Sequence, residues 1–392
     1  MITDEWKKVK LGDVAVNYDN KRIPLSSMQR NTRKGVYPYY GAQGIIDSID
    51  DYIFDGQYLL VAEDGENLKS KKENIVNIAK GKFWVNNHAH IIQNNDLSDF
   101  LYLYYILNNI DIASYITGSA QPKLNQANLN SIEIPLPPLV VQRKISDILS
   151  SLDAKIVNNR AVNHHLEQIA QAIFKSWFVD FEPWGGKMPN DWKWGTFGDC
   201  LATIESGTRP KGGAESEGVP SIGAENIERF GCYDYSKEKY VSRAFYRQMK
   251  RGIVKSGDVL LYKDGAYTGK VSMALDGFPH TECAVNEHVF ILRANDIFLT
   301  QFYLYFWLCL DESRNRLFAM ASSKAAQPGL NQNEVQSLSV LIPNINVVRK
   351  FNETVKSIMY AIAHNAIENR YLSETRDRLL PKLMSGEIEV II

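Results

Sequence analysis

Two stretches of this chain, residues 139–180 and 345–384, space their hydrophobic positions three or four residues apart over about forty residues each. The mean step of about 3.5 residues is the period of a coiled-coil seam. Pro137 and Pro183 flank the first stretch, where proline ends a helix. We therefore predict two long helices whose apolar stripes cover each other. The predicted seam positions are Ile145, Leu152, Asn159, Leu166 and Ile173 in the first helix, and Phe351, Ile358, Asn365, Leu372 and Leu379 in the second.

The second stretch repeats the first in the same register, including its polar exceptions. Asn159 and Asn163 correspond to Asn365 and Asn369. An asparagine in an apolar seam lowers stability but selects one register and one pairing state. If the helices run antiparallel, their midpoints meet, and we expect Asn159 to face Asn365 there. An internal repeat of this kind governs the interpretation of the whole chain.

The segment before each long helix has the pattern of a mixed domain. Runs such as DYIFDGQYLLVAEDG are rich in aromatic and β-branched residues and are broken by Gly, Asn and Asp, which predicts strands and turns. The second segment repeats the first but carries extra residues between the shared strands, as expected when two copies of one module recognise different targets. The repeated polar positions are Asp64, Asn86 and His88 in the first segment and Asp264, Asn286 and His288 in the second.

The predicted fold class is α+β, with two tandem α/β domains separated by two long helices that form a pseudo-two-fold symmetric, antiparallel coiled coil. The antiparallel arrangement is favoured because the two ends of a domain usually lie close together, so the second domain can be inserted at one end of the helix pair. The predicted parts are 1–138 for the first domain, 139–182 for the first helix, 183–344 for the second domain, and 345–392 for the second helix and C-terminal tail.

Composition limits the function without naming it. The 392 residues suffice for two or three domains. No apolar run approaches the roughly 18 residues of a membrane span, and the N-terminal sequence is not a signal peptide, so we expect a cytoplasmic protein without membrane contact. Four scattered cysteines without a CxxC motif indicate reduced thiols. The net charge of −1 argues against nucleic acid covering the whole surface, but it allows local basic surfaces.

The sequence contains no catalytic motif that we would support. P-loop, HExxH, GxSxG and GxGxxG patterns are absent, as is the [DNS]PP[YFW] segment of adenine methylation, so we expect no catalytic residue, metal or cofactor in this chain. Asp64 and Glu66 could form a nuclease pair, but a polar turn is favoured because the second copy has Tyr267 where an acid is needed. His88 and His288 lack clustered metal-binding partners, so we favour histidines that hydrogen-bond a strand end.

Basic residues concentrate in short runs in both domains. Most such runs are solvated faces, but runs on both copies of a module favour DNA contact. Lys and Arg neutralise phosphates, while Arg, Asn and Gln near turns read base edges. The candidate DNA-binding residues are Lys69, Lys71, Lys72 and Lys123 in the first domain, and Arg209, Lys211, Arg247, Lys250, Arg251 and Lys324 in the second.

Over nearly its full length the chain resembles the specificity subunit of type I DNA restriction-modification systems. The motifs that carry the resemblance around the first helix are IPLPPLVVQRKISDILSSLDAKI and LEQIAQAIFKSWFVDFEPW. Those of the second half are SGTRPKGG, GVPSIGAENI, KSGDVLLYKDG and LLPKLMSGEI. One departure is the second lead-in, which reads LIPNINVVRKF in place of a PLPP-x-x-x-Q form.

The resemblance implies a non-catalytic DNA-binding subunit with two target recognition domains. Each would read one half of a bipartite, asymmetric site on double-stranded DNA. The helices would set the spacer and bind two copies of the modification (methyltransferase) subunit, and restriction (translocase-nuclease) subunits would join the complex. The complex would methylate adenine and cut DNA. The alternative is a coiled-coil scaffold with two peptide-binding heads, whose binding need not fall steeply with salt as phosphate contacts do.

Overall fold

The computed structural model describes residues 6–118, 121–323 and 329–391. The chain divides into two compact units. Unit 1 comprises Met1–Ala154 and Leu372–Ile392, and unit 2 comprises Lys155–Tyr371. Each unit contains one mixed domain and part of both long helices, so the four-part division along the sequence stays a prediction. Within the described residues, no helix combines the length and the apolar character needed to cross a bilayer.

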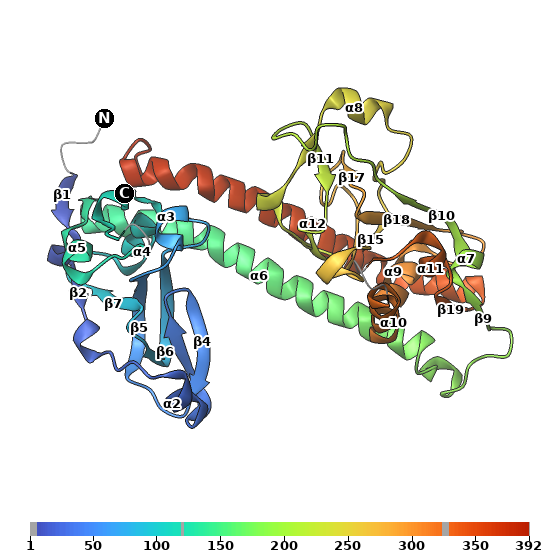
Figure 1. Cartoon of the computed structure of the whole chain (residues 1–392), viewed down its shortest axis with the longest axis horizontal. Coiled ribbons are helices and arrows are strands. Elements are labelled where there is room, and N and C mark those ends of the chain that lie inside the picture. The colour runs from blue at the N-terminus through green and yellow to red at the C-terminus, as the bar shows by residue number, and fades with distance from the viewer. Residues whose placement is uncertain (1–5, 119–120, 324–328, 392) are drawn as a thin grey trace. The chain divides into compact units, whose positions relative to one another are not determined.

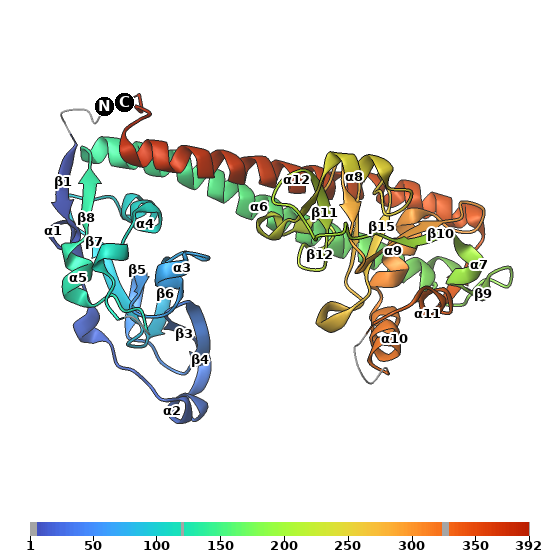
Figure 2. The same cartoon turned by 45° about the horizontal axis from the view of Figure 1, so that its top comes forward.

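The two predicted long helices are present. They are α6 (Leu139–Phe178) and α12 (Ile345–Ser385), and they lie side by side within each unit (Figures 1 and 2). In unit 1, Arg376 of α12 binds Asp153 of α6 at 2.8 Å. In unit 2, residues nearer the end of α6 meet residues nearer the start of α12, as in the ring contact of Phe174 with Phe351. The pair is therefore antiparallel, as predicted.

Unit 1 is built on a six-stranded sheet in the order β2-β7-β5-β6-β3-β4. β3 runs parallel to the end of β6, and the other neighbours are antiparallel. A separate pair, β1-β8, joins the start of the chain to the residues before α6. The strands are β1 (Lys7–Lys10), β2 (Ala15–Asn17), β3 (Lys34–Gly41), β4 (Gly44–Ile49), β5 (Phe54–Ala62), β6 (Val76–Val85), β7 (Ala89–Asn94) and β8 (Glu133–Leu136). The helices are α1 (Leu11–Val14), α2 (Ser27–Asn31), α3 (Asn67–Ser70), α4 (Phe100–Asn109) and α5 (Gln126–Ser131), with 3-10 turns η1 (Asp19–Lys21) and η2 (Ala113–Tyr115).

Unit 2 repeats this topology in two smaller sheets, β10-β18-β15-β16 and β14-β11-β17, beside the pairs β12-β13 and β19-β9. The division has a simple cause, because residues 274–283 form a loop between β16 and β17 where β6 of unit 1 runs without interruption. The strands are β9 (Lys193–Thr196), β10 (Leu201–Ser206), β11 (Val219–Ile222), β12 (Ile227–Arg229), β13 (Cys232–Tyr233), β14 (Tyr240–Val241), β15 (Val259–Tyr262), β16 (Val271–Met273), β17 (Ala284–Val285), β18 (Val289–Ala294) and β19 (Ser339–Ile342). The helices are α7 (Phe197–Cys200), α8 (Arg243–Gln248), α9 (Gln301–Cys309), α10 (Asp311–Ser322) and α11 (Gln332–Gln336), with 3-10 turns η3 (Glu182–Trp184), η4 (Tyr235–Lys237) and η5 (Gly265–Tyr267).

The same aromatic helix anchors the core of each unit. The Tyr102 hydroxyl of α4 donates to the carbonyl of Pro135 at 2.7 Å, and the Tyr303 hydroxyl of α9 donates to that of Leu341 at 2.8 Å. Both tyrosine side chains are fully buried, and each hydroxyl needs its carbonyl partner because an unpaired buried polar group is costly. The repeat therefore extends to the hydrogen bond that ties the helix to the strand preceding each long helix.

Candidate nucleic-acid interface

In both units a carboxylate that follows one strand contacts a histidine that precedes the neighbouring strand. Asp64 Oδ2 lies 2.6 Å from His88 Nδ1 in unit 1, and Asp264 Oδ2 lies 2.9 Å from His288 Nδ1 in unit 2. Each histidine also donates its backbone N–H to an asparagine two residues earlier, at 2.8 and 2.9 Å. The side-chain oxygen of a strand-end asparagine thus holds the turn. We call these residues the polar corner: Asp64, Asn86 and His88 in unit 1, and Asp264, Asn286 and His288 in unit 2.

A segment distant in the sequence closes each polar corner. The backbone N–H of Leu124 donates to the carbonyl of Glu63 at 2.8 Å, and that of Leu330 donates to the carbonyl of Lys263 at 2.7 Å. Antiparallel backbone bridges pair Asp64 with Lys123 in unit 1 and Asp264 with Gly329 in unit 2. The sheet geometry therefore brings three separate segments to one edge in both units.

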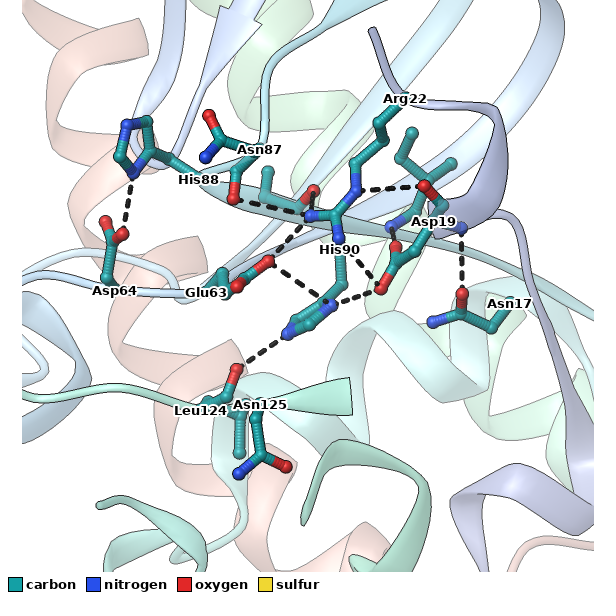
Figure 3. Close-up of polar contacts among 12 residues, drawn as sticks. Asn17, Asp19, Arg22, Glu63, Asp64, Asn87, His88, His90, Leu124 and Asn125 are labelled. Atoms are coloured by element: carbon teal, nitrogen blue, oxygen red, sulfur yellow. Dashed lines mark hydrogen bonds and ion pairs between the residues drawn. The ribbon is translucent and has the colours of Figure 1, made fainter. Parts of the chain in front are cut away.

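In unit 1 the guanidinium of Arg22 beside the corner is committed to internal contacts (Figure 3). Arg22 Nη1 donates to Glu63 Oε2 at 2.6 Å and to the carbonyl of Ala89 at 3.0 Å, and its side chain is only 15% exposed. Lys123, a predicted DNA-binding residue, lies 3.2 Å from Glu63 Oε1. Arg22 therefore holds the fold, while Lys123 is half-exposed and shares its charge with Glu63.

His90 lies at the centre of this network and is buried. Its Nδ1 is 2.5 Å from Asp19 Oδ2 and its Nε2 is 2.7 Å from the carbonyl of Leu124. Both partners are acceptors, so each ring nitrogen faces an oxygen to which it can donate a hydrogen bond. Burial opposes the charged form of the Asp19 carboxyl, but hydrogen bonds from His90 and Ile91 and the charge of Arg22 outweigh it and lower its pKa below the ordinary value. The network is a buried structural ion cluster.

Unit 2 keeps the corner but changes its surroundings. Lys263 and Phe290 occupy the positions of Glu63 and His90, and Lys263 Nζ lies 5.1 Å from the Phe290 ring centroid. A cation over an aromatic face thus replaces a buried ion cluster. The two units therefore share a backbone frame and differ in the charges around it.

Among the described residues, no group of three or more His, Cys, Asp and Glu side chains is placed to hold a metal ion. Asp64 pairs with His88, and Glu66 lies at the start of α3, which fits the polar turn. Burial raises the pKa of the Cys200 thiol to about 11 and of the Cys283 thiol to about 12, so neither forms a reactive thiolate near neutral pH.

Arg30, Arg33 and Lys34 form a basic stretch that leads into β3, and acids that follow it in the chain neutralise it. Arg30 and Lys34 bind Asp47 at 3.2 and 2.7 Å, and Arg33 binds Asp50 at 2.9 Å. These aspartates lie on and just after β4, which is the antiparallel neighbour of β3. A run that is basic in sequence is therefore close to neutral in the fold.

The predicted DNA-binding residues on the loop after β5 differ in their surroundings. Lys71 has a left-handed backbone with φ of 47° and donates to the carbonyl of Ile110 at 3.0 Å, with Asp111 at 3.6 Å. Lys69 is exposed on α3. Lys72 is exposed and has no side-chain hydrogen bond or ion pair within the part of the chain that the structure describes. Their contact with DNA stays a prediction.

Most of the predicted DNA-binding residues of unit 2 pair with no acid among the described residues. Arg209 lies 3.5 Å from Glu287. The remaining described ones are exposed and have no side-chain hydrogen bond or ion pair to any other described residue: Lys211, Arg247, Lys250 and Arg251. Lys324 lies outside the described residues. DNA contact by these side chains also stays a prediction.

The predicted seam lies along the facing sides of the helices, but burial is uneven. The fully or nearly fully buried members are Ile145, Asn159 and Phe351. The half-buried members are Leu152, Leu166, Ile173, Ile358, Asn365, Leu372 and Leu379.

The expectation that Asn159 faces Asn365 is wrong. Asn159 Nδ2 donates to Asn369 Oδ1 at 3.0 Å and to Glu368 Oε2 at 2.7 Å, whereas Asn365 Nδ2 donates to Asn163 Oδ1 at 2.8 Å. The four asparagines therefore pair crosswise. The two asparagine pairs are related by a local two-fold axis that passes between them. Along α6 this axis lies about two residues after Asn159, and not at Asn159 as expected.

Sequence reasoning missed two deeply buried aromatic residues of α6. Phe174 and Phe178 are each 1% exposed and contact Tyr303, Phe306 and Phe351 within unit 2. A step of four residues from Ala170 through both phenylalanines marks this stripe in the sequence. The predicted stripe runs through Ile173, which lies beside this buried face of α6. The buried face shifts gradually around the helix, because α6 packs against the mixed domain as well as against α12.

Comparison with known proteins finds specificity subunits of type I restriction-modification systems. The family described as "Type I restriction modification DNA specificity domain" matches residues 3–168. The specificity subunit of the type I restriction enzyme MjaIX from Methanocaldococcus jannaschii is 25% identical over 74% of this chain and 69% of its own length. The specificity subunit of the type I restriction enzyme HindI from Haemophilus influenzae is 26% identical over 85% of this chain and 84% of its own.

A solved structure shares the fold. The S subunit of a type I restriction-modification system from M. genitalium superposes with a TM-score of 0.64 at 16% identity, covering 98% of this chain and 97% of that one. At this identity the similarity concerns the fold and not particular side chains.

Proposed function

We propose that this chain is a DNA specificity subunit of a type I restriction-modification system, like the proteins it is similar to, and that it reads a bipartite DNA site, one half with the mixed domain of each unit. The observation that carries the proposal is the repeated frame with unlike surroundings. Both units hold the same polar corner, but their exposed charges differ, since Lys250 and Arg251 of unit 2 pair with no described acid, whereas Arg33 of unit 1 is bound by Asp50. Two unlike surfaces on one frame would read two unlike half-sites.

The long helices are proposed to set the spacer and to dock the modification subunits. Exposed Arg143 and Lys144 near the start of α6 correspond in the repeat to exposed Arg349 and Lys350 near the start of α12. Two equivalent surfaces would suit two copies of one partner. Restriction subunits would join this assembly, which would methylate adenine and cut DNA. In this proposal the specificity chain supplies the reading surface, and the partner subunits supply catalytic residues and cofactors.

The test is co-expression of this chain with the modification subunit from the same locus, followed by sequencing of methylated adenines in the host genome. We expect one motif made of two unlike specified halves separated by a constant unspecified spacer. The matched control expresses the modification subunit alone and should methylate no defined motif. The same motif in the control would place DNA reading in the partner and contradict the proposal.

A further inference from the structure

The segment that leads into β15 of unit 2 carries four exposed cations: Arg247, Lys250, Arg251 and Lys255. We call it the cationic segment. No acidic residue occurs between its first and last member. None of the four side chains makes a hydrogen bond or an ion pair with another described residue. Nearby cations do, since Lys237, Lys239 and Arg243 bind acids at 2.9, 2.6 and 3.0 Å. The segment therefore presents uncompensated positive charge.

The backbone beneath these charges is held in place. Ser242 caps α8 by accepting from the N–H of Phe245 at 3.2 Å, and α8 lies at the periphery of unit 2 (Figure 1). Gly252 accepts from the N–H of Val285 at 2.8 Å, and Val254 donates to the carbonyl of Cys283 at 3.1 Å. Both partners lie on or beside β17. The segment is thus an ordered edge of the sheet.

A glycine contact links this edge to the glycine-rich loop. Gly252 has φ of +77°, and a Cβ there would lie 2.6 Å from the Cα of Gly207. Only glycine at this point allows the two backbones to touch. The loop that starts at Gly207 carries Arg209 and the uncommitted Lys211, so two basic segments start from one point of contact.

The equivalent edge of unit 1 has the opposite charge. The bond from the Ile53 N–H to the carbonyl of Phe83, at 3.1 Å, is the counterpart of the bond from Val254 to Cys283. Counting back from these bonds places Asp50 at the position of Arg251. Asp50 is bound by Arg33 at 2.9 Å. Unit 1 is therefore acidic and internally compensated where unit 2 is basic and uncompensated.

We propose that the cationic segment binds phosphates of the DNA backbone, and that only unit 2 has such a phosphate-binding anchor at this edge. Contacts to the second half-site therefore supply the larger salt-dependent share of the DNA affinity. This inference rests on the proposed function. DNA suits the surface better than a protein partner does. Lysine is depleted in protein interface cores, and none of the large hydrophobic side chains exposed in the described residues lies between Trp194 and Tyr267. Because contact to phosphate carries no base readout, the anchor would strengthen binding without changing the sequence read.

The experiment uses the complex with the modification subunit and a duplex carrying the methylation-defined site. Affinity is measured by fluorescence anisotropy from about 50 to about 200 mM salt. Losing two phosphate contacts in Lys250→Ala/Arg251→Ala should lower the slope of log affinity against log salt by about 1.8. The variant should then lose about twelve-fold less affinity than the wild type across this range. The methylated motif should stay the same.

The matched control is Lys187→Ala/Lys193→Ala, which removes the same charge from exposed lysines of unit 2 that make no side-chain ion pair with a described residue. Its slope should equal that of the wild type. Neutral methylphosphonate linkages in the second half-site should lower the wild-type slope more than the same linkages in the first half-site. Circular dichroism and the retained motif confirm that each variant is folded.

The outcomes separate the two proposals. Failure of the wild-type complex to bind a defined site contradicts the proposed function. Specific wild-type binding with equal slopes for Lys250→Ala/Arg251→Ala and its control overturns the anchor alone. An unchanged slope with loss of the modification subunit from the complex would assign the segment to protein docking and also overturn it.

Discussion

The crosswise asparagine pairs make a sharp prediction about the helix seam within unit 2. Asn163 Oδ1 accepts from Asn365 Nδ2 at 2.8 Å, while Asn159 bonds to Asn369 and Glu368. Replacing Asn163 alone with leucine removes the acceptor and leaves the Asn365 amide without its partner. Replacing both members with leucine removes both polar groups together. The effects of the two substitutions on stability should therefore be strongly non-additive.

The magnitude follows from the burial of the pair. Asn163 is 7% exposed and Asn365 is half-buried. An unsatisfied buried amide costs about 1–3 kcal/mol, and partial exposure of Asn365 puts the expected cost of either single change at about 1–2 kcal/mol. The double change to leucine should be nearly neutral or stabilising. The coupling free energy is the effect of the double change minus the sum of the two single changes, so its magnitude should be about 2–4 kcal/mol.

A second cycle with the same residue types provides the control. Asn159 and Asn365 occupy equivalent positions in the repeat but share no hydrogen-bond partner. Their two changes to leucine should add to within about 0.5 kcal/mol. The measurement is native-state hydrogen exchange of peptides covering the second half of α6, because local opening free energies do not require two-state unfolding of the whole chain. Strong coupling in the Asn159 cycle with additivity in the Asn163 cycle would refute the crosswise register.

Further predictions concern the ion cluster, the helices and the core. The pKa of Asp19 and of Glu63 is lowered on folding, so their contribution is present above the unfolded carboxyl pKa of about 4 and is lost as pH falls below it. Exchange protection of β5 and β7 should drop between about pH 5 and 3, and Asp19→Asn should flatten that dependence. Inserting one heptad after Ala161 and one after Ile367, which lie opposite each other between the asparagine pairs, should lengthen the unspecified spacer by at most about three base pairs, since each insert adds roughly 10 Å. Methylated-site sequencing measures this, and altered half-sites would contradict the assignment of reading to the mixed domains. Tyr303→Phe should lower stability by about 1 kcal/mol, seen as a lower denaturant midpoint, because it removes the bond to β19.

The sequence by itself determined the architecture of this protein. The repeat of the two apolar stripes, with their asparagines, predicts paired long helices, and the repeated Asp64 and His88 predict two copies of one domain. These features are readable because each depends on residues close together in the chain. A helical stripe needs only the 3.6-residue turn, and a strand end needs only its own turn residues. The antiparallel direction also followed, from the need to place the ends of an inserted domain close together.

Only the tertiary structure decided which groups meet. Asn163 pairs with Asn365 because the axial offset of two antiparallel helices sets the partners, and that offset depends on packing along their whole length. Arg33 is neutralised by Asp50 because the neighbouring strand returns beside β3, while Arg251 makes no ion pair with any described residue and Glu282 beside its edge is bound by Arg243. The sequence gives only the number of basic residues in a segment. The net charge that the segment shows on the surface depends on which acidic side chains the fold places within about 4 Å of the basic ones. That physical difference is why two runs that are both basic in the sequence present different net charge on the surface of the folded protein.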